Sequence, residues 1–103
     1  MIDLPPEHMA TVKSVLNAIV PGIPVYAFGS RVNGHAKRHS DLDLALRSED
    51  PLHWLQLAWL REAFENSDLP IRVDVVDWAA CSAQFKACIP KMELVTTELI
   101  ATV

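Results

Sequence analysis

Hydrophobic residues follow helical spacing at the start of the chain. Five of them define one apolar face: Met9, Val12, Leu16, Ile19 and Val20. Pro5-Pro6-Glu7 is typical of a first helical turn, where a missing N–H costs no intrahelical hydrogen bond. Pro21-Gly22 ends the pattern. We therefore predict a helix over residues 6–19.

Two strand patterns follow this helix. Val25–Phe28 is a short apolar run that ends at Gly29-Ser30. Between residues 41 and 46, leucine occupies every second position, and aspartate or alanine occupies the positions between. Because side chains on a strand alternate between its faces, this segment is predicted to pack leucines on helices and to turn Asp41 and Asp43 toward a cleft. Residues 30–34 are expected to begin a short helix, and residues 35–40 a polar loop.

A third strand is predicted over residues 71–77. Val73 and Val75 share one of its faces, and Arg72, Asp74 and Val76 share the other. Aspartate is disfavoured in a strand of β-branched residues, so Asp74 is a candidate functional residue. For Asp74 taken alone, the alternative role is an ion pair with Arg72 or Arg31.

A longer helix is predicted between the second and third strands. Asp50-Pro51 resembles an N-cap followed by a first helical residue. Its inner stripe is Leu52, Leu55, Trp59, Ala63 and Phe64, and it ends before Leu69-Pro70. Trp59 is expected in the core, whereas Trp54 and Trp78 are equally consistent with core packing or surface contacts. Residues 82–89 are predicted to form a short helix, and residues 92–103 a helix, a strand or an oligomer contact.

Composition limits the classes of function. The 103 residues suit one domain, and 50% of them are hydrophobic, which is typical of a globular protein. A net charge of −4 disfavours a non-specific nucleic-acid binder. Basic side chains and histidines nevertheless gather in the segment after the first strand: Arg31, His35, Lys37, Arg38 and His39. They are either part of a solvated polar loop or a local positive region that attracts a polyphosphate.

The sequence also indicates a compartment. Cys81 and Cys88 show no zinc-ligand spacing, and they are expected to be free thiols in a reducing cytoplasm. The N-terminus lacks the basic start of a secretion signal, and no apolar run approaches the roughly 20 residues of a membrane span.

The spacing of Gly29-Ser30 and Asp41-Leu42-Asp43 is the main chemical signal. A Gly-Ser turn after a strand offers backbone N–H groups and a hydroxyl to a phosphate, and Gly29 lets that phosphate approach. Gly34 is expected to permit a tight turn. Arg31 or Lys37 is expected to pair with phosphate oxygens. An isolated Gly-Ser is usually only a turn, and an isolated Asp-x-Asp is usually a solvated strand end.

Asp74 completes the pattern if its strand neighbours the strand of Asp41 and Asp43. Three carboxylates could then hold two Mg²⁺ ions, the hard cations that bind both carboxylates and nucleotide phosphates. Asp41 and Asp43 would bridge both ions, and Asp74 would complete the shell of the ion near the acceptor and help to take its proton. The three aspartates are thus the predicted catalytic and metal-binding residues.

These motifs resemble the minimal nucleotidyltransferases, small members of the DNA polymerase β-like superfamily. The matching segments are Gly29-Ser30-Arg31-Val32-Asn33-Gly34, Ser40-Asp41-Leu42-Asp43-Leu44 and Val73-Asp74-Val75-Val76. The resemblance implies an α/β (α+β) fold, with a short mixed sheet and helices on one face. It also implies Mg²⁺ and a nucleoside triphosphate, most often ATP.

The resemblance further implies a partner. Small members of the family are commonly encoded beside a toxic HEPN-domain protein, which they bind as antitoxins and in some cases modify by adding AMP to a tyrosine. We therefore expect a nucleotidyltransferase with a protein acceptor, in a heteromer or a homodimer. Two alternatives are an antitoxin that neutralises its partner by binding alone and an enzyme that modifies a small molecule. The chain lacks a basic or aromatic nucleic-acid platform, so activity on DNA is not expected.

Overall fold

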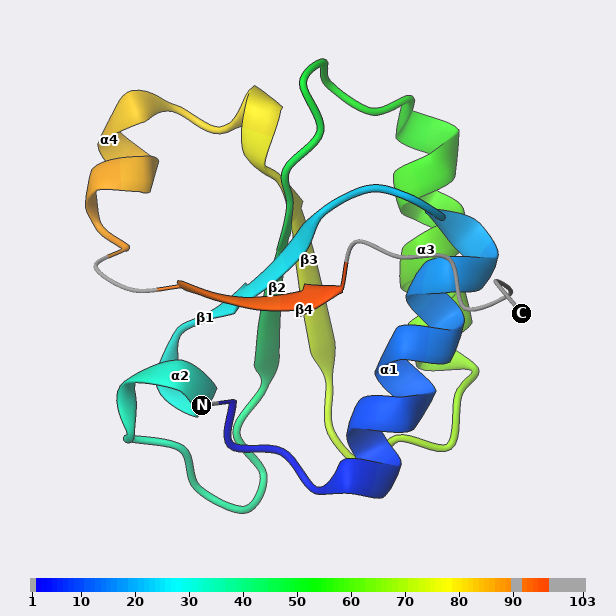
Figure 1. Ribbon diagram of the computed structural model, residues 1–103, viewed down its shortest axis with the longest axis vertical. Helices are drawn as coiled ribbons and strands as arrows, with labels where there is room; N and C mark the ends of the chain where they lie inside the picture. Colours follow the sequence, from blue (N-terminus) through cyan, green and yellow to red (C-terminus); the bar gives the residue numbers. More distant parts are fainter. Residues whose placement is uncertain (1, 90–91, 97–103) are drawn as a thin grey trace.

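A four-stranded sheet with helices around it makes up the computed structural model, which describes residues 2–89 and 92–96 (Figure 1). The elements are α1 (Pro6–Ile19), β1 (Val25–Phe28), α2 (Ser30–Asn33), β2 (Leu42–Leu46), α3 (Trp54–Glu65), β3 (Val73–Asp77), the 3₁₀ turn η1 (Trp78–Ala80), α4 (Ala83–Ala87) and β4 (Met92–Thr96).

The sheet is mixed, as expected. Its strand order is β3-β2-β1-β4; β1 is antiparallel to β2 and to β4, and β2 is parallel to β3. A parallel pair cannot be joined by a tight turn, and α3 makes the connection between β2 and β3. The strands that carry Asp43 and Asp74 are therefore direct neighbours.

The core lies between the sheet and the pair α1 and α3, which occupy the same side of the sheet (Figure 1). Leu42, Leu44 and Leu46 are completely buried there. Each buried leucine contributes about 1.5–3 kcal/mol, which fixes the orientation of β2. Asp43 consequently projects from the opposite face, on the side of α4. The alternation predicted for this strand is confirmed.

Several predicted boundaries agree with the structure. The first helix has the predicted limits and begins with a proline in its first turn. The short helix α2 begins at Ser30 and is closed by Gly34 in the left-handed conformation. The Ser82 hydroxyl accepts a hydrogen bond from the Phe85 N–H and caps α4.

The predicted start of α3 is wrong. Asp50-Pro51 precedes the helix, whose N-cap is His53; the His53 Nδ1 accepts a hydrogen bond from Leu55 N–H. The Leu52 N–H instead donates to Oδ2 of Asp77, at 2.8 Å. This contact with the end of β3 holds residue 52 outside the helix.

The predicted core position of Trp59 is also wrong. Trp59 is 56% exposed, whereas its neighbour Leu60 is completely buried. Phe64 is buried as predicted, and Leu60 takes the core position that was predicted for Trp59. Trp54 is also exposed, and Trp78 is partly buried beneath Arg47 and Lys86.

The tail of the chain is strand where it is described. β4 pairs with β1 and places Val95 in the core. The remaining residues of the predicted tail, 97–103, lie outside the described residues. Cys81 and Cys88 are free, as expected. Within the described residues, no helix is both long and apolar enough to cross a membrane.

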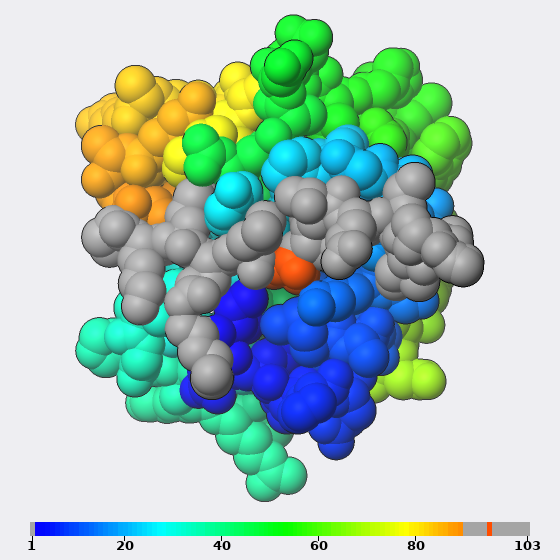
Figure 2. Space-filling model, in the orientation of Figure 1, coloured from blue at the N-terminus to red at the C-terminus, as the bar shows by residue number. Residues whose placement is uncertain are grey.

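The space-filling view shows the N-terminal segment and α1 in blue beside the teal residues of α2 and the loop that follows it (Figure 2). A backbone hydrogen bond of 2.7 Å from the Asp3 N–H to the Arg31 carbonyl joins these two regions. The start of the chain is thus attached to the segment that carries the Gly-Ser motif.

Candidate active site

Gly29 and Asp43 are in contact where β1 ends. β1 and β2 pair with Phe28 opposite Asp43, so the residue after Phe28 lies next to that carboxylate. Gly29 has a φ of +83°, in the region that favours glycine. A Cβ at position 29 would lie 2.5 Å from Oδ2 of Asp43. The backbone conformation therefore favours glycine, and a side chain at this position would displace the Asp43 carboxylate.

Asp43 and Asp74 occupy opposite positions on the parallel strands β2 and β3. Asp74 accepts a 3.0 Å hydrogen bond from Nε of Arg72, and the Arg72 Nη2 is also 3.0 Å from the same oxygen. The side chain of Arg72 is 74% exposed, so this ion pair contributes at most about 1 kcal/mol to stability. It nevertheless directs the Asp74 carboxylate toward Arg72.

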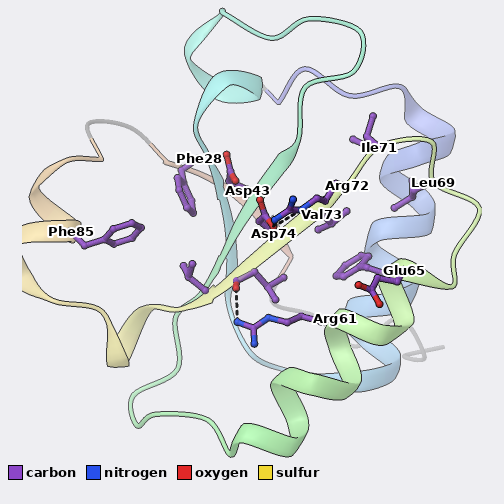
Figure 3. Close-up of a pocket in the computed structure, with 13 residues that line it drawn as sticks. Phe28, Asp43, Arg61, Glu65, Leu69, Ile71, Arg72, Val73, Asp74 and Phe85 are labelled. Atoms are coloured by element: carbon purple, nitrogen blue, oxygen red, sulfur yellow. Dashed lines mark hydrogen bonds and ion pairs between the residues drawn. The ribbon is translucent and has the colours of Figure 1, made fainter.

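A cavity of about 910 Å³ contains both carboxylates. Figure 3 shows Asp43 and Asp74 together, with Phe28 and Phe85 on one side of them. The Phe28 and Phe85 rings meet edge to face, with centroids 6.4 Å apart, and Phe85 comes from α4. The cavity therefore combines an acidic region with an aromatic wall.

The Asp43 carboxyl is electrostatically crowded. Burial raises its pKa, and the neighbouring carboxylates of Asp74 and Asp41 raise it further, while the Arg72 guanidinium partly opposes them. All three predicted acids are therefore close enough to affect the charge of one side chain. Such crowding costs free energy in the folded protein unless a cation relieves it.

The three carboxylates do not form a closed ligand set. Among residues 2–89 and 92–96, no three histidine, cysteine, aspartate or glutamate side chains are grouped closely enough to hold a metal ion. Asp41 also precedes β2, which begins at Leu42, although it was predicted on the strand. Carboxylate oxygens are nevertheless the ligands that Mg²⁺ prefers, and the crowding of Asp43 is the condition that a divalent cation relieves. Asp43 and Asp74, which occupy opposite positions on neighbouring strands, thus fit Mg²⁺ as a pair of carboxylates that leaves ligand positions for substrate phosphates.

Ser30 lies directly after Gly29, in a tight turn. The N–H groups of Val32 and Asn33 both donate to the Gly29 carbonyl, and the Gly34 N–H donates to the Ser30 carbonyl. The backbone of the Gly-Ser motif is thereby fixed close to Asp43. Gly34 has a φ of +85°, which agrees with its predicted place in a tight turn.

Arg31 and Lys37 do not line the cavity of the acids. Both line a second cavity of about 460 Å³, behind the loop of residues 36–39. The Arg31 guanidinium is buried and donates to backbone carbonyls, including that of Ser40 at 3.0 and 3.1 Å. The geometry thus favours a structural contact for Arg31 over the predicted phosphate contact.

Among the residues that line the acidic cavity, sequence reasoning missed Phe28, Arg72 and Phe85 as site residues. Arg72 was predicted only as an ion-pair partner, although the strand face that it shares with Asp74 already placed it beside the acids. Phe85 had no local signal, because it meets Phe28 across a separation of 57 positions in the chain.

Comparisons with known proteins agree with this geometry. The family described as "Polymerase beta, Nucleotidyltransferase" matches residues 12–97. The chain is 50% identical over 102 residues to "Probable protein adenylyltransferase MntA" of Haemophilus influenzae, covering 99% of this chain and 90% of that protein. A solved structure described as "Crystal structure of the toxin-antitoxin with AMP-PNP" has a similar fold, with a TM-score of 0.61 and 23% identity over 85% of this chain and 72% of the other.

Proposed function

The chain belongs to the polymerase β nucleotidyltransferase family, and from this premise we propose that it transfers AMP from ATP to a hydroxyl of a partner toxin and so acts as an antitoxin. The observation that carries the proposal is the crowding of Asp43 by Asp41 and Asp74 beside Gly29. Support for a protein acceptor comes from the 50% identical relative, which is named a probable protein adenylyltransferase.

Asp41, Asp43 and Asp74 are the residues that would hold Mg²⁺. When bound, Mg²⁺ neutralises phosphate charge and makes the acceptor hydroxyl more acidic. Two ions are expected, from the resemblance to the minimal nucleotidyltransferases.

The remaining steps use the chain's own groups. The missing side chain of Gly29 makes room for the Asp43 carboxylate, and Ser30 would offer its hydroxyl and N–H to the terminal phosphates. The acceptor oxygen forms a bond to the α-phosphorus, and the bond from that phosphorus to the bridging oxygen breaks, so that pyrophosphate leaves. The hydroxyl proton passes to the Asp74 carboxylate, which exchanges it with solvent.

The acceptor that we propose is a tyrosine of a HEPN-domain toxin, the partner implied by the sequence resemblance. Phe28 and Phe85 form an aromatic wall beside the acids, and edge-to-face contacts with such a wall suit a phenol ring. Lys37 would contact a phosphate only after its long side chain has left the second cavity.

A second function has its own observation. Trp54 and Trp59 are 69% and 56% exposed on α3, and large exposed aromatics favour a contact surface for another protein. The chain could neutralise its toxin through such a surface without catalysis. Under this alternative, the carboxylates of Asp41, Asp43 and Asp74 are not needed to protect cells from the toxin.

Intact mass spectrometry distinguishes the two functions. The protein encoded next to this chain's gene is incubated with the chain, ATP and Mg²⁺, and the Asp41→Asn, Asp43→Asn double variant serves as the control. An added AMP mass that is absent with the double variant supports transfer. A stable complex without added mass supports neutralisation by binding and overturns the proposed transfer.

A further inference from the structure

Arg31 is a buried cation whose donors are directed at backbone oxygens. It is only 5% exposed. Its Nη1 donates to the Asp3 carbonyl at 2.8 Å, and its Nη2 to the Lys37 and Arg38 carbonyls at 3.4 and 3.2 Å. Nε and Nη2 both donate to the Ser40 carbonyl. The guanidinium thus joins four peptide groups from two separate segments.

The Ser40 carbonyl belongs to the peptide bond that leads into Asp41. On the other side of Asp41, the Leu42 N–H donates to the Arg72 carbonyl at 3.0 Å. The backbone is therefore held both before and after the first aspartate of the motif. Asp41 lies outside the ladder of β2, so these two contacts hold the backbone from which its side chain projects.

The loop before Asp41 is closed by its own hydrogen bonds as well. The Ser40 hydroxyl accepts from the Lys37 N–H at 2.8 Å, and the Ser40 N–H donates to the Lys37 carbonyl at 3.0 Å. Arg31 donates to the Lys37, Arg38 and Ser40 carbonyls of this closed turn. It therefore holds the loop as one unit against α2.

The N-terminal segment takes part in the same arrangement. The Asp3 N–H donates to the Arg31 carbonyl at 2.7 Å, and the Asp3 carbonyl accepts from the Arg31 side chain. Figure 2 shows this segment, in blue, beside the teal loop. The two reciprocal bonds anchor Arg31 from the side opposite Ser40.

Burial of a cation requires compensation. No carboxylate in the described part of the chain forms an ion pair with Arg31, so carbonyl dipoles supply that compensation. Only a planar guanidinium can donate in several fixed directions at once; a lysine ammonium is a single point on a flexible stem. The site therefore distinguishes arginine from lysine by shape rather than by charge.

We propose that Arg31 is a positioning residue for the transfer reaction. It holds the peptide between Ser40 and Asp41 and so orients the Asp41 carboxylate toward Asp43. It does not bind the nucleotide phosphates. This inference rests on the proposed function for its kinetic consequence. Its structural consequence, an ordered loop of residues 37–40, is independent of that function.

Kinetics separates a positioning residue from a phosphate ligand. We would measure transfer from labelled ATP to the partner protein with Arg31→Lys and Arg31→Met, with Arg47→Met as a control that removes a guanidinium stacked on Tyr26 and Trp78. Both Arg31 variants should lose about 10- to 100-fold in kcat, the range for residues that orient a site, with KM for ATP nearly unchanged. Arg31→Lys that keeps kcat but raises KM would overturn the proposal.

Hydrogen exchange tests the loop without reference to activity. The amides of Lys37 and Ser40 should exchange at least about tenfold faster in Arg31→Lys than in the wild type and in Arg47→Met, because their turn loses its anchor. Unchanged exchange at these two amides would contradict the positioning role, whether or not the protein transfers AMP.

A second pair of variants guards against an Arg31 variant that does not fold. Asp3→Pro removes the N–H that donates to the Arg31 carbonyl, whereas Asp3→Ala keeps it. Faster exchange of Ser40 and lower kcat in Asp3→Pro alone would support the proposal. Equal behaviour of the two Asp3 variants would overturn it.

Discussion

Gly29 lies against the carboxylate of Asp43, so closely that a Cβ would stand 2.5 Å from Oδ2. The far end of an aspartate side chain can rotate away from such a contact. A side chain at position 29 would therefore be accommodated by turning the carboxylate away from the position that the motif gives it.

Gly29→Ala should abolish transfer and destabilise the fold. The backbone at Gly29, with φ +83° and ψ −154°, is essentially restricted to glycine, and its strain in alanine costs about 1–3 kcal/mol. Gly34→Ala is the matched control, because Gly34 has φ +85° but nothing within 4 Å of the place that a Cβ would occupy. Urea denaturation and AMP transfer measure the two effects. A Gly29→Ala protein that transfers AMP as well as Gly34→Ala would refute the role given to this contact.

Asp43→Asn should stabilise the metal-free protein at neutral pH while removing its activity. The pKa of Asp43 is raised in the folded state, so the folded state holds the proton more tightly than the unfolded chain does. The free energy of unfolding therefore falls as the pH rises from the usual aspartate pKa to the raised pKa of Asp43. Above the raised pKa, the full loss of stability is present. Like charges opposite each other on a sheet cost up to about 1 kcal/mol.

The measurement for Asp43→Asn is chemical denaturation between acidic and neutral pH in the presence of a chelator. The gain in stability should be present at neutral pH and should disappear in acid. Asp68→Asn, which removes an exposed carboxylate after α3, controls for net charge. A variant that is less stable than the wild type at neutral pH would show that Asp43 is not crowded.

Mg²⁺ should raise the thermal stability of the wild type. A ligand that binds only the folded state stabilises it by about 2.7 kcal/mol at 100 times its Kd. Asp41→Asn, Asp43→Asn and Asp74→Asn should each reduce the shift in Tm, because each removes one carboxylate of the proposed set. Titration of Tm with MgCl₂, with NaCl of equal ionic strength as the control, tests this. An equal shift in wild type and variants would place the cation elsewhere.

Leu60→Ala should cost much more stability than Trp59→Ala, although tryptophan is the larger residue. Leu60 is completely buried, and truncation of a buried leucine costs about 2–5 kcal/mol. Trp59 is mostly exposed, and such a surface change is usually within about 0.5 kcal/mol. The midpoints of urea unfolding compare the two directly. If Trp59→Ala proved the more damaging, the orientation of α3 would be wrong.

Local sequence patterns predicted the elements that depend on near neighbours. The alternation of leucine and aspartate in residues 41–46 was enough to orient β2, because burial of the leucines dominates. Proline and glycine marked the limits of α1 and α2 for the same local reason.

Contacts between distant residues account for the predictions that failed. The start of α3 depends on Asp77, a buried residue that receives the Leu52 N–H from 25 positions away. The choice of Leu60 over Trp59 depends on how α3 packs against α1 and β3. The role of Arg31 depends on Asp3, at the other side of α1 in the sequence. None of these contacts leaves a periodic signal in the chain.

The parallel pairing of β2 with β3 has a consequence for the chain as it leaves the ribosome. Gly29, Ser30, Asp41 and Asp43 emerge together, but Asp74 can take its place opposite Asp43 only after α3 has been synthesised and has crossed the sheet. A nascent chain that stops before β3 thus carries the Gly-Ser turn without the complete set of acids. Under the proposed roles of the three aspartates, transfer activity is therefore acquired late, with the docking of an edge strand.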